Sequence, residues 1–215
     1  MEAIFEVTQR PNFPELLQTH IVLSVVSLLI AIAIAIPVSL AVRNTPLGSA
    51  IAINIGNVGR AVPSIAILAL ALPVLGFGFA PSLLALTLLA IPPILINAAT
   101  GLKEVSREVV DAARGMGLSE AQILSRIQLP IAMPVIFAGI RTSAVQVVAA
   151  ATLATFIGGG GLGELIVEGL QRSDTPVLLA GSFTIALLAI ATELIFGGLE
   201  RAFTPKGLRL ARKKK

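Results

Sequence analysis

Five long apolar segments alternate with shorter polar ones along this chain. Each is long enough for a transmembrane helix, which needs roughly 20 residues to cross the hydrocarbon core. The predicted spans are residues 19–42, 51–75, 81–100, 131–157 and 177–199. This pattern predicts an all-α polytopic membrane protein with five core transmembrane helices.

The second and third spans are interrupted by backbone-breaking residues. The breaks fall at Gly56, Gly59, Arg60 and Pro63 in the second span and at Pro92 and Pro93 in the third. We expect the membrane part of the second span to begin near Ala61, after a short surface helix. Irregular backbone at membrane depth is tolerated where it is buried in protein or lines a cavity. The breaks therefore indicate a translocation path, with simple helix kinks as the alternative.

The composition agrees with an integral membrane protein. Charged residues make up 13% of the 215 residues and apolar ones 55%, whereas soluble domains carry about 25% charged residues. The chain has no cysteine, which excludes disulfide and thiol chemistry. The acidic N-terminal stretch lacks the basic region of a signal peptide, so we expect the first span to be retained.

Basic residues collect on one side of the predicted spans. The larger group comprises Arg43, Arg60, Lys103, Arg107, Arg114, Arg126, Arg201, Lys206, Arg209, Arg212 and residues 213–215; the smaller group is Arg10 and Arg172. The positive-inside rule then places the N-terminus outside and the C-terminus in the cytoplasm. The predicted division is an extracytoplasmic segment 1–15, a membrane domain 16–200 and a basic cytoplasmic tail 201–215.

A polar segment, residues 101–130, separates the third and fourth spans on the cytoplasmic side. Val105, Val109, Ala112 and Ala113 recur at helical spacing, and Gly115 and Gly117 break that helix. Ser119 and Gln122 form a capping box for a second helix, and Pro130 ends that helix or starts the fourth span. The small residues leave room for a close contact. An amphipathic loop packed on its own bundle is the alternative interpretation.

This segment resembles the signature of bacterial ABC importer permeases. The signature reads Glu-Ala-Ala, three residues, Gly, nine residues, Ile, any residue, Leu-Pro. The matching positions are Asp111, Ala112, Ala113, Gly117, Ile127, Leu129 and Pro130, and Asp111 for Glu is the one departure. The resemblance implies the type I importer fold, similar to that of methionine permeases.

The same resemblance makes the polar segment a coupling helix that docks on a separate ATPase subunit. It implies that Asp111, Ala112, Ala113 and Gly117 lie at the docking surface, and that Leu129 and Pro130 set the turn into the fourth span. No GxxxxGK[ST] motif occurs in this chain. ATP and Mg²⁺ are therefore expected on the partner ATPase, and no cofactor is expected in this chain.

Residues 60–78 and 151–181 resemble the osmoprotectant branch of these permeases, which carries glycine betaine, choline and carnitine. The resemblance implies a separate extracytoplasmic binding protein, a second permease subunit that is identical or related, and a location in the bacterial inner or plasma membrane. Two alternatives remain open: an importer of an amino acid such as methionine, and an ATP-independent channel or carrier.

Two charges and several polar side chains lie within the predicted spans. Arg141 and Glu193 both fall about 10–15 Å from the cytoplasmic boundary, so we expect them to pair or to line the inner cavity at one level. Separate snorkelling to the interface is the alternative. The polar candidates for the pore are Asn97, Gln146, Thr152 and Thr155, and packing between helices is their alternative role.

The remaining motifs point away from catalysis. Gly158, Gly160 and Gly163 match GxGxxG, but that pattern marks a dinucleotide site only within a βαβ unit. We expect an external turn there, with Glu164 opening a short helix. His20 is the only histidine, and without cysteine it provides no metal site. We predict that the chain is not an enzyme and binds no nucleic acid. Because it has no Trp or Tyr for a cation–π cage, tight substrate selection is expected in the binding protein.

Overall fold

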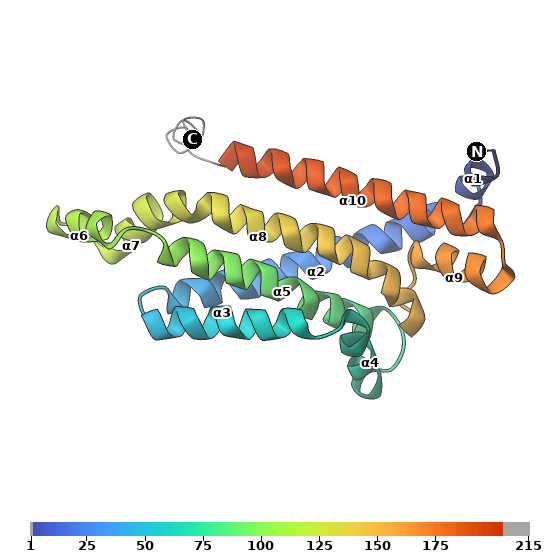
Figure 1. Cartoon of the computed structure of the whole chain (residues 1–215), viewed down its shortest axis with the longest axis horizontal. Helices are drawn as coiled ribbons and strands as arrows, with labels where there is room; N and C mark the ends of the chain where they lie inside the picture. Colours follow the sequence, from blue (N-terminus) through green and yellow to red (C-terminus); the bar gives the residue numbers. More distant parts are fainter. Residues whose placement is uncertain (1, 204–215) are drawn as a thin grey trace.

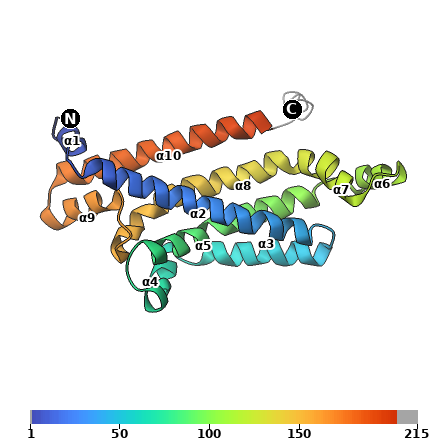
Figure 2. The ribbon, with the colours of Figure 1, turned by 180° about the vertical axis from the view of Figure 1, so that it is seen from behind.

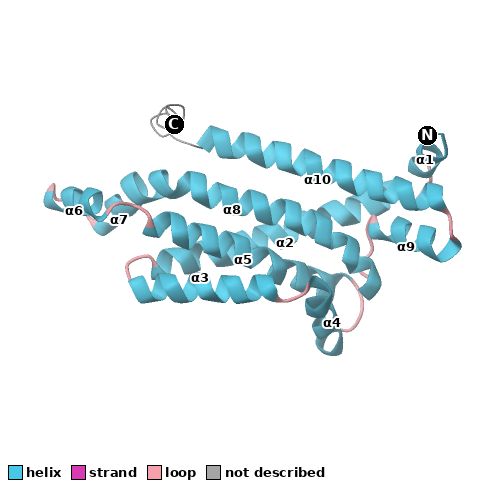
Figure 3. Ribbon diagram, viewed as in Figure 1, coloured by secondary structure: helices cyan, strands magenta, loops and turns pink. Residues whose placement is uncertain are grey.

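The computed structural model describes residues 2–203, and these residues form helices joined by short loops without a strand (Figure 3). The helices are α1 (Glu2–Thr8), α2 (Phe13–Val42), α3 (Pro46–Ala61), α4 (Ser64–Leu75), α5 (Phe79–Lys103), α6 (Arg107–Gly115), α7 (Glu120–Ile123), α8 (Leu129–Ala150), α9 (Gly163–Arg172) and α10 (Thr175–Phe203). A π-helical turn, Leu124–Gln128, joins α7 to α8, and a 3₁₀ segment, Ala151–Ile157, follows α8. The predicted all-α fold is confirmed.

The long helices form one elongated bundle. α2, α3, α5, α8 and α10 run alongside one another, whereas α6 and α7 project beyond one end (Figure 1). α1, α4 and α9 lie toward the opposite end, and the view from behind shows the same division (Figure 2). The bundle therefore presents two different ends, one of which carries the polar segment.

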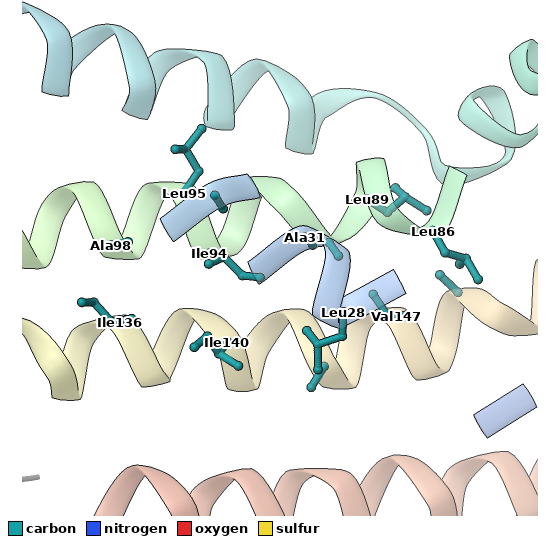
Figure 4. Close-up of a cluster of buried hydrophobic side chains, with 14 of the residues drawn as sticks. Leu28, Ala31, Leu86, Leu89, Ile94, Leu95, Ala98, Ile136, Ile140 and Val147 are labelled. Carbon is teal, nitrogen blue, oxygen red and sulfur yellow. The ribbon is translucent and has the colours of Figure 1, made fainter. Parts of the chain in front are cut away.

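The core lies where α5 packs between α2 and α8. Leu28 and Ala31 of α2, Ile94 and Ala98 of α5 and Ile140 of α8 meet there and are buried (Figure 4). Lipid is as apolar as these side chains, so close van der Waals packing must hold the helices together. Small residues permit this approach. A Cβ at Gly139 of α8 would lie 2.6 Å from the Cβ of Asn97 on α5.

Four helical stretches have the length and composition of membrane spans. They are Phe13–Val42, Phe79–Lys103, Glu120–Ile157 and Thr175–Phe203. α3 and α4 together would form a fifth, although they are bent by 90° at their junction. The positions of the first, third, fourth and fifth predicted spans agree with these helices.

The expected layout of the second span is wrong. Residues Pro46–Ala61 do not form a surface helix before the span; they are α3, which runs along α5 within the bundle (Figure 1). The chain turns away after Ala61, at the point where the membrane part was expected to begin. Gly56 and Gly59 are not breaks. Both glycines lie on the face of α3 that packs on α5, where a Cβ at Gly59 would lie 2.9 Å from Cγ of Pro92.

This correction also moves Arg60. It lies in the last turn of α3, so at 1.5 Å per residue it is about 20 Å along the helix from the turn that contains Arg43. Arg60 therefore does not belong with the basic residues at the polar-segment end. Arg43, Lys103, Arg107, Arg114 and Arg126 still lie at that end, and Arg10 and Arg172 lie at the other.

The proline breaks of the third span are buried in protein. Pro92 and Pro93 lie inside a continuous α5 and are inaccessible to solvent. Neighbouring side chains donate to the nearby carbonyl groups: Ser143 Oγ to Ala90 O at 2.8 Å, and Asn97 Nδ2 to Pro93 O at 2.8 Å. The carbonyl groups that the two prolines leave without an intrahelical donor are those of Leu88 and Leu89, four residues earlier.

Candidate functional site

The polar segment folds as two short helices joined by a tight glycine turn. α6 ends at Gly115, and Gly117 has a φ of +84°. The Ser119 hydroxyl accepts from the Gln122 backbone amide at 3.3 Å, and the side-chain Oε1 of Gln122 accepts from the Ser119 backbone amide at 2.9 Å. The predicted helix, turn and capping box are confirmed.

The second short helix continues directly into the membrane. α7, the π-helical turn and α8 form one helical stretch, Glu120–Ile157. Pro130 lies in the first turn of α8 and lacks the amide that would donate to the carbonyl four residues earlier. The π-helical turn immediately precedes this missing donor. Leu129 packs against the core cluster and Ile127 is half-buried, so both anchor the segment to the bundle.

Arg114 holds the two short helices together. Its Nε and Nη2 donate to Glu120 Oε1 at 3.0 and 2.8 Å, and its Nη1 donates to Asp111 Oδ1 at 3.0 Å. The hydrogen bond to Glu120 is the main reason that the pKa of the Arg114 guanidinium is raised above its usual value. Exposed ion pairs contribute little stability singly, and of the two only the Arg114–Glu120 pair connects α6 to α7. Asp111 therefore has a partner within its own segment.

The expected docking residues differ in their accessibility. Asp111, Ala112 and Gly117 are exposed, as a docking role requires. Ala113 is fully buried beneath α6, so its predicted place on the docking surface is wrong. A helix can present only part of its circumference, and consecutive alanines point in different directions.

Two exposed apolar residues of the projecting tip were not among the predicted docking residues. Val109 and Met116 are 44% and 73% exposed at the projecting tip of the molecule. Val109 lies on α6, and Met116 lies between two glycines in the turn. Exposed apolar side chains grouped on a projection indicate a protein contact. A methionine between two glycines, in an otherwise polar stretch, is the sequence signal that would have found this position.

Position 117 requires glycine because of its backbone conformation and not because neighbouring atoms leave too little space for a side chain. A Cβ at Gly117 meets no atom within 4 Å, but its positive φ is unfavourable for other residues. Substitution of Ala for Gly117 should therefore cost about 1–2 kcal/mol locally and raise tryptic cleavage after Arg114 by roughly five- to thirtyfold. Gly115→Ala is the matched control, since Gly115 has open space and no positive φ. Equal cleavage of the two variants would contradict this explanation.

The two charges within the spans meet between α8 and α10. Arg141 Nη2 donates to Glu193, and Arg141 Nη1 donates to Glu200 Oε2 at 3.0 Å. The prediction from the sequence paired Arg141 with Glu193 alone and did not include Glu200. It follows Glu193 by seven residues and thus lies on the same helix face. Phe137 and Phe203 stack nearby across the same two helices, with ring centroids 4.7 Å apart. These contacts join α10 to α8 near the polar-segment end.

The candidate pore residues are partly engaged in local structure. Asn97 donates within its own helix, as described above, and Thr155 Oγ1 donates to Gly160 O at 3.2 Å. Thr152 and Gln146 are half-buried. Asn97 and Thr155 thus make local structural contacts, and the pore role of all four residues remains a prediction.

The glycine-rich motif forms a turn between helical segments. Gly158, Gly160 and Gly161 have positive φ values, and the motif connects the 3₁₀ segment to α9. Its setting is not the βαβ unit of a dinucleotide site, and Glu164 lies in the first turn of α9 as expected. His20 is buried beside this turn and donates from Nε2 to Val148 O at 2.9 Å. Within residues 2–203 no group of three potential ligands could hold a metal ion.

A bundle of membrane-length helices with a projecting, partly apolar helical tip defines this protein as a multi-pass membrane protein. The chain belongs to the family of binding-protein-dependent transport system inner membrane components, whose sequence pattern matches residues 27–206. It is therefore a permease of the bacterial inner or plasma membrane, and its family is one of transporters and not of enzymes.

Several characterised proteins are similar over nearly the whole chain. The carnitine transport permease protein OpuCB of Listeria monocytogenes is 38% identical over 99% of this chain and 98% of its own length. The glycine betaine/carnitine/choline transport system permease protein OpuCB of Bacillus subtilis (strain 168) is 36% identical over 88% of both chains. The osmoprotectant import permease protein OsmY of Salmonella typhimurium is 34% identical over 87% of this chain and 80% of its own.

The fold is similar to that of a solved transporter. An inward-facing structure of the MetNI methionine ABC transporter superposes with a TM-score of 0.78, covering 91% of this chain and 100% of that chain at 22% identity. This similarity shows that the chain has the type I ABC permease fold.

Proposed function

We propose that this chain is the transmembrane permease subunit of an ATP-driven importer of compatible solutes of the glycine betaine, carnitine or choline type. The observation that carries the proposal is the 38% identity to a carnitine transport permease over 99% of the chain. The relatives named for glycine betaine, choline and osmoprotectants support the same substrate class. The methionine transporter is similar at only 22% identity.

In this proposal the tip formed by α6 and the glycine turn docks on an ATPase subunit, which holds ATP and Mg²⁺. α6 follows α5, and α7 continues into α8, so a displacement of the tip moves two core helices together as a rigid unit. The exposed Ala112, Val109 and Met116 support a docked partner at this position. Arg114 contributes by connecting α6 to Glu120 of α7.

The proposed orientation places the polar-segment end in the cytoplasm. Five basic residues lie at that end, namely Arg43, Lys103, Arg107, Arg114 and Arg126, and the positive-inside rule assigns such an end to the cytoplasm. The opposite end, with α1 and α9, then faces a separate substrate-binding protein. α3 and α4 form the fifth, broken span. A second permease subunit, identical or related, completes the pore. Arg201 of the predicted tail lies in the last turn of α10, and the other basic residues of that tail lie outside the described residues.

The substrate assignment is tested by uptake in the source bacterium. We expect deletion of the gene to abolish the saturable, high-affinity uptake of labelled glycine betaine, carnitine or choline that this system supports, and re-expression to restore it. Uptake should stop when ATP is depleted while the proton gradient is maintained. Loss of methionine uptake would instead favour the amino-acid importer, and uptake independent of ATP would favour a channel or carrier.

A further inference from the structure

A groove with a basic lining lies at the base of the polar segment. Its volume is about 640 Å³, within the range of roughly 300–1,000 Å³ that is typical of small-molecule sites. Its walls come from the α2–α3 turn on one side and from the α5–α6 connection and α6 on the other. The charged residues that line it are Arg43, Lys103, Arg107, Arg114, Asp111 and Glu120.

The two acids do not neutralise this lining. Both of them pair with Arg114, which leaves Arg43, Lys103 and Arg107. None of these three forms an ion pair with a described residue. Four cations and two carboxylates line this concave surface, so its lining carries a net charge of +2.

Arg43 provides a second, independent observation. Its Nη1 donates to Leu40 O at 2.7 Å, but its Nε is buried and has no hydrogen-bond partner. A buried donor without an acceptor is costly. An anionic group in the groove would accept from the part of the Arg43 guanidinium that lines it and would supply negative charge. Both observations point to a ligand that carries several oxygens and a negative charge, as a phosphate does.

The position of the groove indicates where such a phosphate comes from. Arg43 directly follows α2, Lys103 is the last residue of α5, and Pro46 begins α3. The groove therefore lies at the level where three helices leave the hydrocarbon core, which is the level of the lipid headgroups. Basic pockets between membrane helices at this level bind anionic headgroups.

We propose that this groove binds the headgroup of an anionic phospholipid, whose phosphate contacts Arg43, Lys103 and Arg107. A lipid bound there would join the α2–α3 turn to the base of the coupling segment. The site is separate from the tip formed by Ala112 and Met116. The inference rests on the proposed function only for its assignment to the cytoplasmic leaflet.

The test uses the absence of tryptophan from the natural chain. Asn44 lines the groove, so Asn44→Trp in the full-length permease gives a single fluorescent reporter. The protein is reconstituted in phosphatidylcholine nanodiscs that contain increasing shares of brominated phosphatidylglycerol or brominated phosphatidylcholine. We expect brominated phosphatidylglycerol to quench the tryptophan fluorescence at a share of the lipid at least about tenfold lower than the share of brominated phosphatidylcholine that gives the same quenching. Phe203→Trp, at the end of α10, is the control reporter and should show no such preference.

Charge variants establish which residues hold the headgroup. Combining Arg43→Gln, Lys103→Gln and Arg107→Gln should remove the preference for phosphatidylglycerol, whereas Arg126→Gln, an exposed cation outside the groove, should retain it. Equal quenching by both lipids, or a preference that survives the triple substitution, would overturn the proposal. So would displacement by millimolar inorganic phosphate, which would identify a soluble anion. Because the readout requires neither ATPase nor transport, its failure is distinguishable from failure of the proposed function.

Discussion

Replacing Ala112 with tryptophan is expected to abolish solute uptake and co-purification of the ATPase, while the permease stays folded in the membrane. Ala112 is exposed on α6 at the projecting tip, so the indole ring meets solvent in the free permease. In the proposed complex it would occupy the space in which the ATPase packs against the helix. We expect a loss of at least about 2 kcal/mol of docking free energy, or about thirtyfold in affinity.

The measurement is purification of the tagged permease from its native membrane in mild detergent, followed by quantification of the associated ATPase. Ala112→Ser is the matched control, because it changes polarity with little change in size and should retain the ATPase. Ala112 is preferable to Gly117, where the positive φ would combine backbone strain with steric exclusion. Full retention of the ATPase by a well-folded Ala112→Trp permease would exclude this face of α6 from the docking surface.

Four of the spans could be located from the sequence because length and apolarity are properties of a single segment. The second span could not. Gly56 and Gly59 are read locally as helix breakers, but they pack on Pro92 and Ile96, which lie far along the chain. Only the tertiary contact distinguishes a glycine that ends a helix from one that admits a neighbouring helix. The displacement of Arg60 from the basic end follows from the same error.

The candidate site likewise divides into features that a local sequence pattern determines and features that depend on tertiary contacts. The capping box of Ser119 and Gln122 depends on four consecutive residues and was predicted correctly. The burial of Ala113 and the pairing of Arg114 with Glu120 depend on how the chain turns at Gly117, which the residue pattern does not determine. Arg141 and Glu193 could be placed at one depth by counting residues. Glu200 was not included in the predicted pair because it lies at the end of the predicted fifth span. A charged residue is common at such a membrane boundary and does not by itself indicate a partner.

Reversing the charge of Arg141 is expected to remove most of the folded permease from the membrane. Arg141 holds both Glu193 and Glu200 between α8 and α10, so Arg141→Glu would replace the cation that contacts both glutamates with a third carboxylate. Unpaired charges within a membrane bundle are strongly unfavourable. The yield and the unfolding temperature of a fluorescent fusion in detergent measure the effect. Arg141→Gln should be less severe, because it removes the cation without adding a third negative charge.

Exchange of the two charges separates a specific ion pair from a general intolerance of substitution. Arg141→Glu combined with Glu193→Arg restores one pair but leaves Glu200 beside a new carboxylate, so we expect only partial recovery. Adding Glu200→Gln removes that repulsion and should bring the yield close to that of the natural chain. A double variant no better than Arg141→Glu alone would mean that Arg141 and Glu193 do not act as a pair. If the double variant instead recovers fully, adding Glu200→Gln gives no further gain in yield. That result would limit the network to Arg141 and Glu193, with Glu200 contributing only local contacts at the end of α10.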